Sequence, residues 1–133
     1  MKRKEFIKNS SLLAAAALLT NSKVFGFQEN IVRVGLIGTK GMGWSNLNAI
    51  LKVPGVVCTA LCDVDENVLK NRAMELKKRD INVKTYINYQ DLLSASDVDV
   101  VIVATPDHWH CMQMVDAVAA GKDVYVEKQI GRA

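Results

Sequence analysis

A glycine-rich turn is the first feature of the sequence that could do chemistry. Gly38, Gly41 and Gly43 directly follow an apolar, β-branched run and precede a stretch with helical spacing. Glycine lets bare backbone approach a ligand closely, and N–H groups at a helix N-terminus point at an anion. Lys40 and Met42 lie between these glycines, and Lys40 stands where the G-x-G-x-x-G pattern has its second glycine. We expect these five residues to bind a pyrophosphate; a tight turn without a ligand is the alternative.

An acidic residue follows the second apolar run. Asp63 comes directly after Val56–Cys62 and stands 25 residues beyond Gly38. A carboxylate at this position accepts hydrogen bonds from the ribose hydroxyls of a dinucleotide. Asp65 and Glu66 add negative charge that would repel a 2′-phosphate, so we favour NAD over NADP as the cofactor. The alternative is that Asp63 and Asp65 cap the following helix, and we expect one of them to do so in either case.

The elements that must position these groups alternate between strand and helix. Apolar runs predict strands at residues 31–37, 56–62, 83–86, 98–104 and 123–126. Amphipathic spacing predicts helices at residues 42–53, 66–79, 89–94 and 106–120. Right-handed crossovers then give an α/β fold with a doubly wound parallel sheet in the order 3-2-1-4-5. Because seven residues follow position 126, we expect the sixth strand of such a sheet to be missing.

The last predicted helix carries several expectations of its own. Thr105 is expected to cap it, with Pro106 at its first position and Gly121 just past its end. Its core-facing side chains are expected to be Met112, Val115 and Ala119. Trp109 is expected in the core as well, with packing under the cofactor as the alternative. The three cysteines, none in a C-x-x-C pair, are expected to be core or near-core thiols; they are Cys58, Cys62 and Cys111.

The N-terminus has the composition of an export signal, which we place at residues 1–26. A basic start leads into the uncharged run Leu12–Leu19, which is too short for the ~20 apolar residues of a membrane span. The segment around Arg3 and Lys4 resembles a twin-arginine signal, with Lys4 at the second arginine position. A Sec-type signal, a lipoprotein-like signal and an amphipathic helix on the domain are the alternatives. We therefore expect a periplasmic or secreted protein, or a cytoplasmic one if the signal is not functional.

The net charge of +3 belongs entirely to this N-terminal segment. Residues 1–22 hold four basic groups and one acidic group, so the charges of the remaining 111 residues sum to zero. The domain that we place at residues 27–133 therefore has no excess of positive charge with which to bind nucleic acid. We expect no nucleic-acid partner.

Two further motifs make the sequence resemble a known family. They are ATPDHWH at residues 104–110 and GKDVYVEK at residues 121–128. Together with VGLIG and ALCDVDE earlier in the chain, they resemble the N-terminal NAD(P)-binding Rossmann domain of the Gfo/Idh/MocA oxidoreductases. The resemblance runs from about Ile31 to Lys128. It implies an enzyme that transfers hydride between NAD and a sugar or polyol.

The resemblance also implies roles for particular residues. It adds to the cofactor-binding candidates Thr105, Pro106, His108, His110, Glu127 and Lys128. In the family's E-K-P motif, the lysine lies near the nicotinamide and the reacting hydroxyl, which makes Lys128 the catalytic candidate; Gln129 replaces the proline. We expect no metal at His108 and His110, because residues two apart do not share one face of a helix.

In the family, a second α/β domain supplies the substrate pocket and further acid and base groups. Since that half of the cleft is not in this sequence, we expect the chain to bind the dinucleotide and to show no efficient turnover alone. An inactive truncated fragment, a non-catalytic dinucleotide-binding module and part of an NAD-dependent glycosidase are the alternatives. A methyltransferase-like fold would also use a glycine turn and an acidic ribose ligand, but the two later motifs argue against it. Both a monomer and an oligomer are left open.

Overall fold

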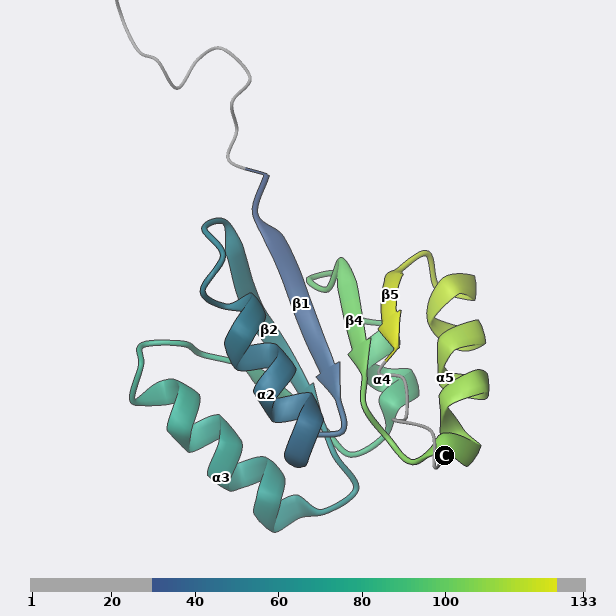
Figure 1. The fold of residues 1–133 in the computed structure, drawn as a ribbon, viewed down its shortest axis with the longest axis horizontal. Helices are drawn as coiled ribbons and strands as arrows, with labels where there is room; N and C mark the ends of the chain where they lie inside the picture. The colour runs from purple at the N-terminus through teal and green to yellow at the C-terminus, as the bar shows by residue number, and fades with distance from the viewer. Residues whose placement is uncertain (1–29, 127–133) are drawn as a thin grey trace, which may run out of the picture. The chain divides into compact units, whose positions relative to one another are not determined.

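The structure, a computed structural model, describes residues 30–126. Five parallel strands form one sheet in the order β3-β2-β1-β4-β5, as predicted (Figure 1). The strands are β1 (Val32–Ile37), β2 (Val56–Cys62), β3 (Lys84–Tyr86), β4 (Val100–Val103) and β5 (Asp123–Val126). The helices are α2 (Gly41–Ile50), α3 (Glu66–Lys77), α4 (Tyr89–Leu93) and α5 (Asp107–Ala119). Each predicted element is present, with bounds that differ from the predicted ones by three residues or fewer.

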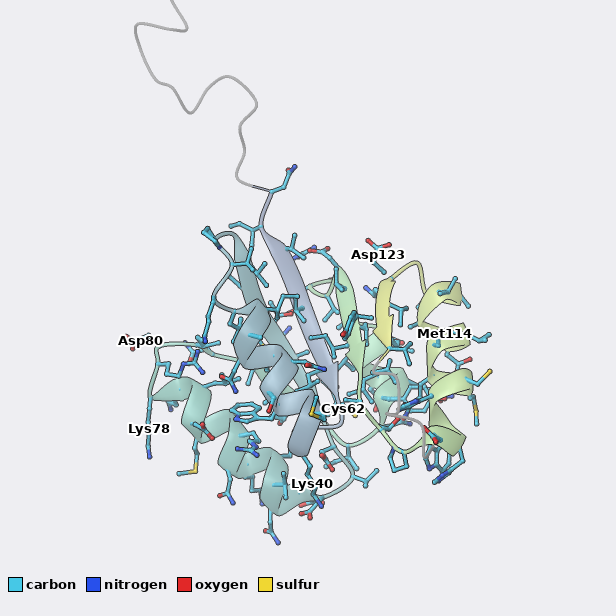
Figure 2. The ribbon with its side chains drawn as sticks, in the orientation of Figure 1. Lys40, Cys62, Lys78, Asp80, Met114 and Asp123 are labelled. Atoms are coloured by element: carbon cyan, nitrogen blue, oxygen red, sulfur yellow. The ribbon has the colours of Figure 1, made fainter. Side chains whose placement is uncertain are left out.

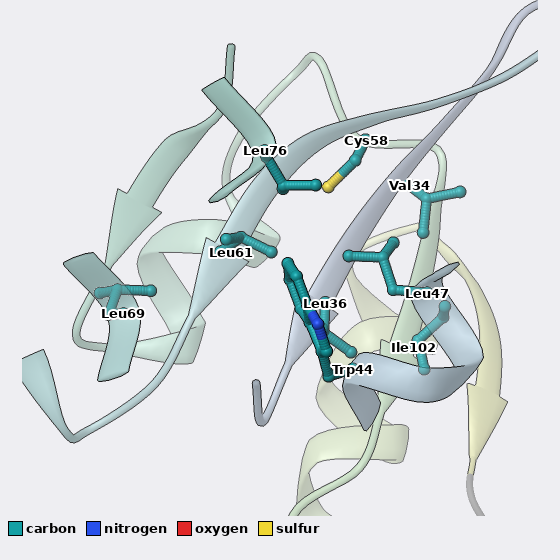
Figure 3. Close-up of a cluster of buried hydrophobic side chains, with 9 residues drawn as sticks. All are labelled: Val34, Leu36, Trp44, Leu47, Cys58, Leu61, Leu69, Leu76 and Ile102. Carbon is teal, nitrogen blue, oxygen red and sulfur yellow. The ribbon is translucent and has the colours of Figure 1, made fainter. Parts of the chain in front are cut away.

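Helices cover both faces of the sheet, as a doubly wound fold requires. Helices α2 and α3 lie on one face, whereas α4 and α5 lie on the other (Figure 1). Figure 3 shows the core under α2 and α3, which consists of Val34, Leu36, Trp44, Leu47, Cys58, Leu61, Leu69, Leu76 and Ile102. The core under α4 and α5 consists of Ile37, Ala60, Cys62, Leu92, Leu93, Val98, Val101, Val103 and Ala117. The three central strands, β1, β2 and β4, are buried on both sides, which explains their nearly continuous apolar sequences.

The strand register brings three strand ends to one place. Ile37 at the end of β1 is paired with Cys62 on one side and with Val103 on the other. The residues that follow these strands, Gly38 and Asp63 among them, therefore share the carboxyl edge of the sheet. In parallel sheets whose strand order reverses, this edge beside the first strand is where ligands bind.

The inward face of α5 differs from the predicted one. Met112, Val115 and Ala119 are exposed, and the buried residues are Gln113 and Ala117. Apolar residues occur around most of this helix, so two different stripes have helical spacing. In the buried stripe, Ala117 is small enough to pack against the sheet. Gln113 accepts a hydrogen bond at its amide oxygen, which offsets the cost of burying this polar side chain.

Two other predictions for this helix were wrong in the same way. Trp109 was expected in the core but is 44% exposed, with its ring tilted against His108. Cys111 was expected to be a near-core thiol but is exposed, whereas Cys58 and Cys62 are buried as predicted. Both errors follow from the rotation of α5, which turns these positions away from the sheet.

The ends of α5 are also only partly as predicted. Pro106 is the N-cap, and no side chain among the described residues caps the helix; the hydroxyl of Thr105 donates to the side-chain oxygen of Gln113 instead. At the other end Gly121 has φ +77°, the left-handed conformation expected after a helix. Within residues 30–126, no helix combines the length and apolar character needed to cross a membrane.

An ion pair joins the amino end of β1 to the segment before β4. The Arg33 guanidinium donates from Nη2 to Asp99 Oδ1 at 2.8 Å and from Nε to Asp99 Oδ2 at 3.0 Å. The backbone N–H of Arg33 also donates to Asp99 Oδ2 at 3.0 Å. These bonds, the side-chain ones first, lower the pKa of Asp99 from 3.8 to about 2.

This ion pair makes stability depend on pH. Because the pKa of Asp99 is lower in the folded state, its stabilising contribution is complete above pH 3.8 and is lost as the pH falls through about 2. The side chains are 41% and 39% exposed, so solvent screening keeps the contribution small. In urea denaturation between these pH values, we expect Asp99→Asn to lose less stability than the wild type. Parallel curves for the two proteins would contradict this assignment.

Candidate functional site

A cavity of about 610 Å³ opens at the carboxyl edge of the sheet. Its wall includes the following predicted site residues: Gly38, Lys40, Met42, Asp63, Thr105, Pro106 and His110. Lys40 and Cys62, which also lines the cavity, lie at the same end of the sheet in Figure 2. The remaining lining residues are Ile37, Val64, Ile87, Tyr89, Ala104 and Gln113. The volume is in the range of small-molecule sites, and the wall is largely apolar with a few polar groups, as such sites usually are.

The glycine turn forms one side of this cavity and requires its glycines. Gly38 has φ +93°, and a Cβ there would lie 2.7 Å from the carbonyl oxygen of Ala104. A Cβ on Gly43 would lie 2.2 Å from the carbonyl oxygen of Gly38, so α2 packs directly on the turn. A Cβ on Gly41 would meet nothing within 4 Å, which leaves open space beside the turn.

The first turn of α2 is suited to an anion. No side chain in the described part of the chain caps this helix, and its first turn carries no acidic residue. Its first backbone N–H groups, at Gly41, Met42 and Gly43, are the groups that the positive end of a helix presents to a phosphate. The bare backbone of the turn and this helix end fit a pyrophosphate.

Asp63 is held in place by the turn itself. Its Oδ2 accepts hydrogen bonds from the backbone N–H and the hydroxyl of Thr39, both at 2.9 Å. Its Oδ1 accepts from the backbone N–H of Asp65 at 3.0 Å. An ionised carboxylate has about four lone-pair sites, so these three donors leave capacity for another. Asp63 therefore meets the cavity as a fixed acceptor, as a ribose-binding carboxylate must.

Asp65 caps the next helix, as was expected of one of these two aspartates. Its Oδ1 accepts from the backbone N–H groups of Asn67 and Val68 at 3.1 and 3.3 Å, at the start of α3. Its Oδ2 accepts from Lys40 Nζ at 3.1 Å. The hydrogen bond from Val68, and then that from Lys40, lower the pKa of Asp65 below its ordinary value. Lys40, which lines the cavity, is therefore held in an ion pair.

The other end of the cavity lies at the start of α5. The side chain of His110 is 15% exposed, and its Nε2 is buried with no hydrogen-bond partner among the described residues. Its Nδ1 lies 3.7 Å from Asp107 Oδ1. A buried polar atom without a partner is costly, and this one belongs to a histidine that lines the cavity. His108 is exposed and is not part of the cavity wall.

Several residues of the site did not stand out in the sequence. Thr39 is fully buried between Asp63 and Arg72, whose Nε donates to the carbonyl oxygen of Thr39 at 3.1 Å. The Arg72 guanidinium lies 4.4 Å from the centre of the Trp44 ring, which holds the arginine in place. Only the position of Thr39 inside the glycine turn could have indicated its role. The contacts of Arg72 depend on how α3 packs against α2.

Cys62 lines the cavity but has no chemistry of its own there. Burial first, and then the nearby carboxylates of Asp63 and Asp91, raise the pKa of its thiol to about 12. A thiol that stays protonated is a poor nucleophile, so Cys62 contributes packing to the wall.

Three predictions concern residues outside the described part of the chain. Glu127 and Lys128 follow β5 directly and lie beyond position 126. The predicted export signal at residues 1–26 lies before position 30. The cofactor-binding and catalytic roles of the first two, and the role of the signal, stay predictions.

Comparison with known proteins identifies the class to which this fold and site belong. The family model for the Gfo/Idh/MocA "oxidoreductase family, NAD-binding Rossmann fold" matches residues 32–130. The chain therefore belongs to the Gfo/Idh/MocA oxidoreductases, as the sequence motifs predicted, and forms their NAD-binding Rossmann domain.

Among curated proteins, a glycosyl hydrolase family 109 protein from a Shewanella species is 32% identical over 116 residues, which are 81% of this chain and 25% of that protein. An α-N-acetylgalactosaminidase from Shewanella oneidensis is 34% identical over 103 residues, which are 73% of this chain and 22% of that protein. The chain thus spans about a quarter of the length of the curated relatives that it matches.

Solved structures show the same fold. Myo-inositol 2-dehydrogenase from Lactobacillus plantarum is 29% identical with a TM-score of 0.66, covering 75% of this chain and 29% of its own. Myo-inositol dehydrogenase from Lactobacillus casei, solved with NAD(H) and myo-inositol, is 25% identical with a TM-score of 0.68, covering 76% of this chain and 29% of its own.

Proposed function

We propose that this domain holds NAD along the carboxyl edge of its sheet and serves an oxidoreductase that acts on sugars or polyols. The main observation in support is that hydrogen bonds from Thr39 fix the Asp63 carboxylate beside the glycine turn. A turn that needs Gly38 and Gly43 leads into a helix that no described side chain caps, and the same turn fixes the Asp63 carboxylate through Thr39. Diphosphate and ribose would then bind next to each other, as they occur in a dinucleotide.

The other end of the cavity suits the nicotinamide half of the cofactor. NAD, when bound, supplies an acceptor for a hydride from a carbon that carries a hydroxyl group. Thr105, Pro106 and His110 would line that half. We assign to the Lys128 ammonium the task of polarising the substrate hydroxyl and assisting the movement of its proton, with Glu127 beside it.

The test is to follow NADH absorbance while NAD and a panel of sugars and polyols are mixed with two proteins. One is the 133-residue chain, and the other is the product of the longest reading frame that contains it. We expect NADH to form with the longer product, and we expect Lys128→Met to lower that rate by roughly 10²–10⁴-fold. The chain alone is expected to bind NAD without efficient turnover. Robust turnover by the chain alone, or no effect of Lys128→Met, would refute these assignments.

A glycosidase cycle is the second candidate, because the curated relatives at 32–34% identity are glycosyl hydrolases. In such a cycle the hydride returns to the substrate, so no NADH accumulates. The longer product is mixed with nitrophenyl N-acetylgalactosaminide, with and without added NAD. Release of nitrophenol only when NAD is present, without a rise in NADH, would favour this candidate. Accumulation of NADH with an alcohol substrate would favour the dehydrogenase.

The location and the partners of the protein are part of the same proposal. The basic start and the apolar run of residues 1–26 support export to the periplasm, by a twin-arginine-like route that carries folded proteins. Fusion of these residues to a reporter that functions only in the periplasm would test this. The charges of residues 23–133 sum to zero, which supports a dinucleotide and a sugar-like substrate as partners in place of nucleic acid.

A further inference from the structure

The ribose end of the cavity contains an ion pair, Lys40–Asp65, that the proposed function does not use. Lys40 Nζ is 3.1 Å from Asp65 Oδ2, and the backbone N–H of Asp65 donates at 3.0 Å to Asp63 Oδ1. Lys40, Asp63 and Val64 all line the cavity. Hydrogen bonds therefore link Lys40 to Asp65 and Asp65 to Asp63 at one end of the site.

Lys40 is the only lysine or arginine among the described residues that line this cavity. The other nearby cations on α3 have partners elsewhere. Lys70 lies 4.0 Å from Glu66, and Arg72 binds the carbonyl oxygen of Thr39 and the carboxylate of Glu75. If Asp65 did not hold Lys40, this lysine would be the cation available to a phosphate at the ribose.

We propose that the Lys40–Asp65 ion pair determines the preference of this site for NAD over NADP. While Asp65 holds Lys40, a 2′-phosphate next to Asp63 meets carboxylates and, within the described cavity wall, no free cation, so NADP is repelled. Once released, Lys40 would pair with that phosphate in a charge-assisted hydrogen bond. This inference rests on the proposed NAD site, and it makes Asp65 a specificity-determining residue as well as a helix cap.

The double role of Asp65 permits a selective variant. Asparagine and serine cap helices about as well as aspartate, so Asp65→Asn and Asp65→Ser keep an oxygen for the N–H groups of Asn67 and Val68. Both variants remove the negative charge that holds Lys40. Glu66→Gln is the matched control, because it removes one negative charge at the next residue, whose partner is Lys70.

The experiment is calorimetric titration of the 133-residue chain with NAD and, separately, with NADP at one fixed, low salt concentration. For Asp65→Asn we expect NADP affinity to rise about tenfold, the effect of one charge-assisted hydrogen bond. NAD affinity should stay within about threefold of wild type, since neither the turn nor Asp63 changes. Combining Lys40→Met with Asp65→Asn should return NADP affinity to the wild-type value.

The outcomes separate this inference from the proposed function. If every folded variant binds NAD but neither cap variant gains NADP affinity, the ion pair does not set the preference and the NAD site stands. An equal gain in Glu66→Gln would mean that total charge, not the release of Lys40, is responsible, which also overturns the inference. If the folded wild type binds neither dinucleotide, the proposed function falls, and this inference falls with it.

Discussion

Replacing Gly43 with alanine is expected to lower the free energy of unfolding by about 3 kcal/mol, the upper range for inserting a methyl group into packed structure. The new Cβ would lie 2.2 Å from the carbonyl oxygen of Gly38 and 2.7 Å from the Cβ of Ala104. Gly38 directly follows β1 and Ala104 directly follows β4, so neither contact is with the end of a flexible side chain, and α2 has to move away from the turn. Its first N–H groups would move with it, and we expect NAD affinity to fall at least tenfold. Urea denaturation and calorimetric titration measure the two effects.

Gly121→Ala is the matched control. Gly121 follows the end of α5 and has φ +77°, but an added Cβ there would meet nothing within 4 Å. Its replacement should cost about 1 kcal/mol, through backbone strain alone, and leave NAD affinity unchanged. If Gly43→Ala were as mild as this control, α2 would not pack on the turn as closely as the structure indicates.

The second large effect is expected for Asp63→Asn, which should weaken NAD binding by roughly 10- to 100-fold. The change removes the charge that a ribose-binding acceptor provides. Asparagine also has an N–H₂ group in place of one carboxylate oxygen. That group must face either the N–H of Thr39 or the N–H of Asp65, so one donor meets another. The turn would then lose the group that fixes it from the end of β2. Titration calorimetry at a temperature where circular dichroism shows the variant folded measures the loss.

Asp123→Asn makes the same chemical change at an exposed residue at the start of β5, away from the cavity wall. It should bind NAD like the wild type. Equal affinities for Asp63→Asn and Asp123→Asn would remove Asp63 from the binding site.

Much of the fold and part of the site could be predicted from the sequence because their signals are local. A strand buried on both faces needs a nearly unbroken apolar run, and the runs before Gly38 and Asp63 are of this kind. Parallel pairing then places the residues that follow each run at one edge. For this reason the sequence alone predicts that the glycine turn and the acidic residue lie together.

The features that could not be predicted depend on how helices pack. Helix α5 has apolar side chains on most sides, so its periodicity did not distinguish the stripe of Met112 and Val115 from that of Gln113 and Ala117. The buried stripe is fixed by contacts with the sheet and by the hydrogen bond from Thr105. Likewise, the ion pair of Lys40 with Asp65 joins residues that only the strand crossover brings together.

The central claim is that the glycine turn and Asp63 bind NAD, and amide NMR of the isotope-labelled chain tests it most directly. On titration with NAD, the account predicts saturable shifts of the amide signals of residues 38–43 and 63–65, together with those around His110. Unchanged spectra from a well-folded chain would contradict the account. Shifts confined to the opposite end of the sheet, around Val57 and Ile81 in the second cavity, would contradict it as well.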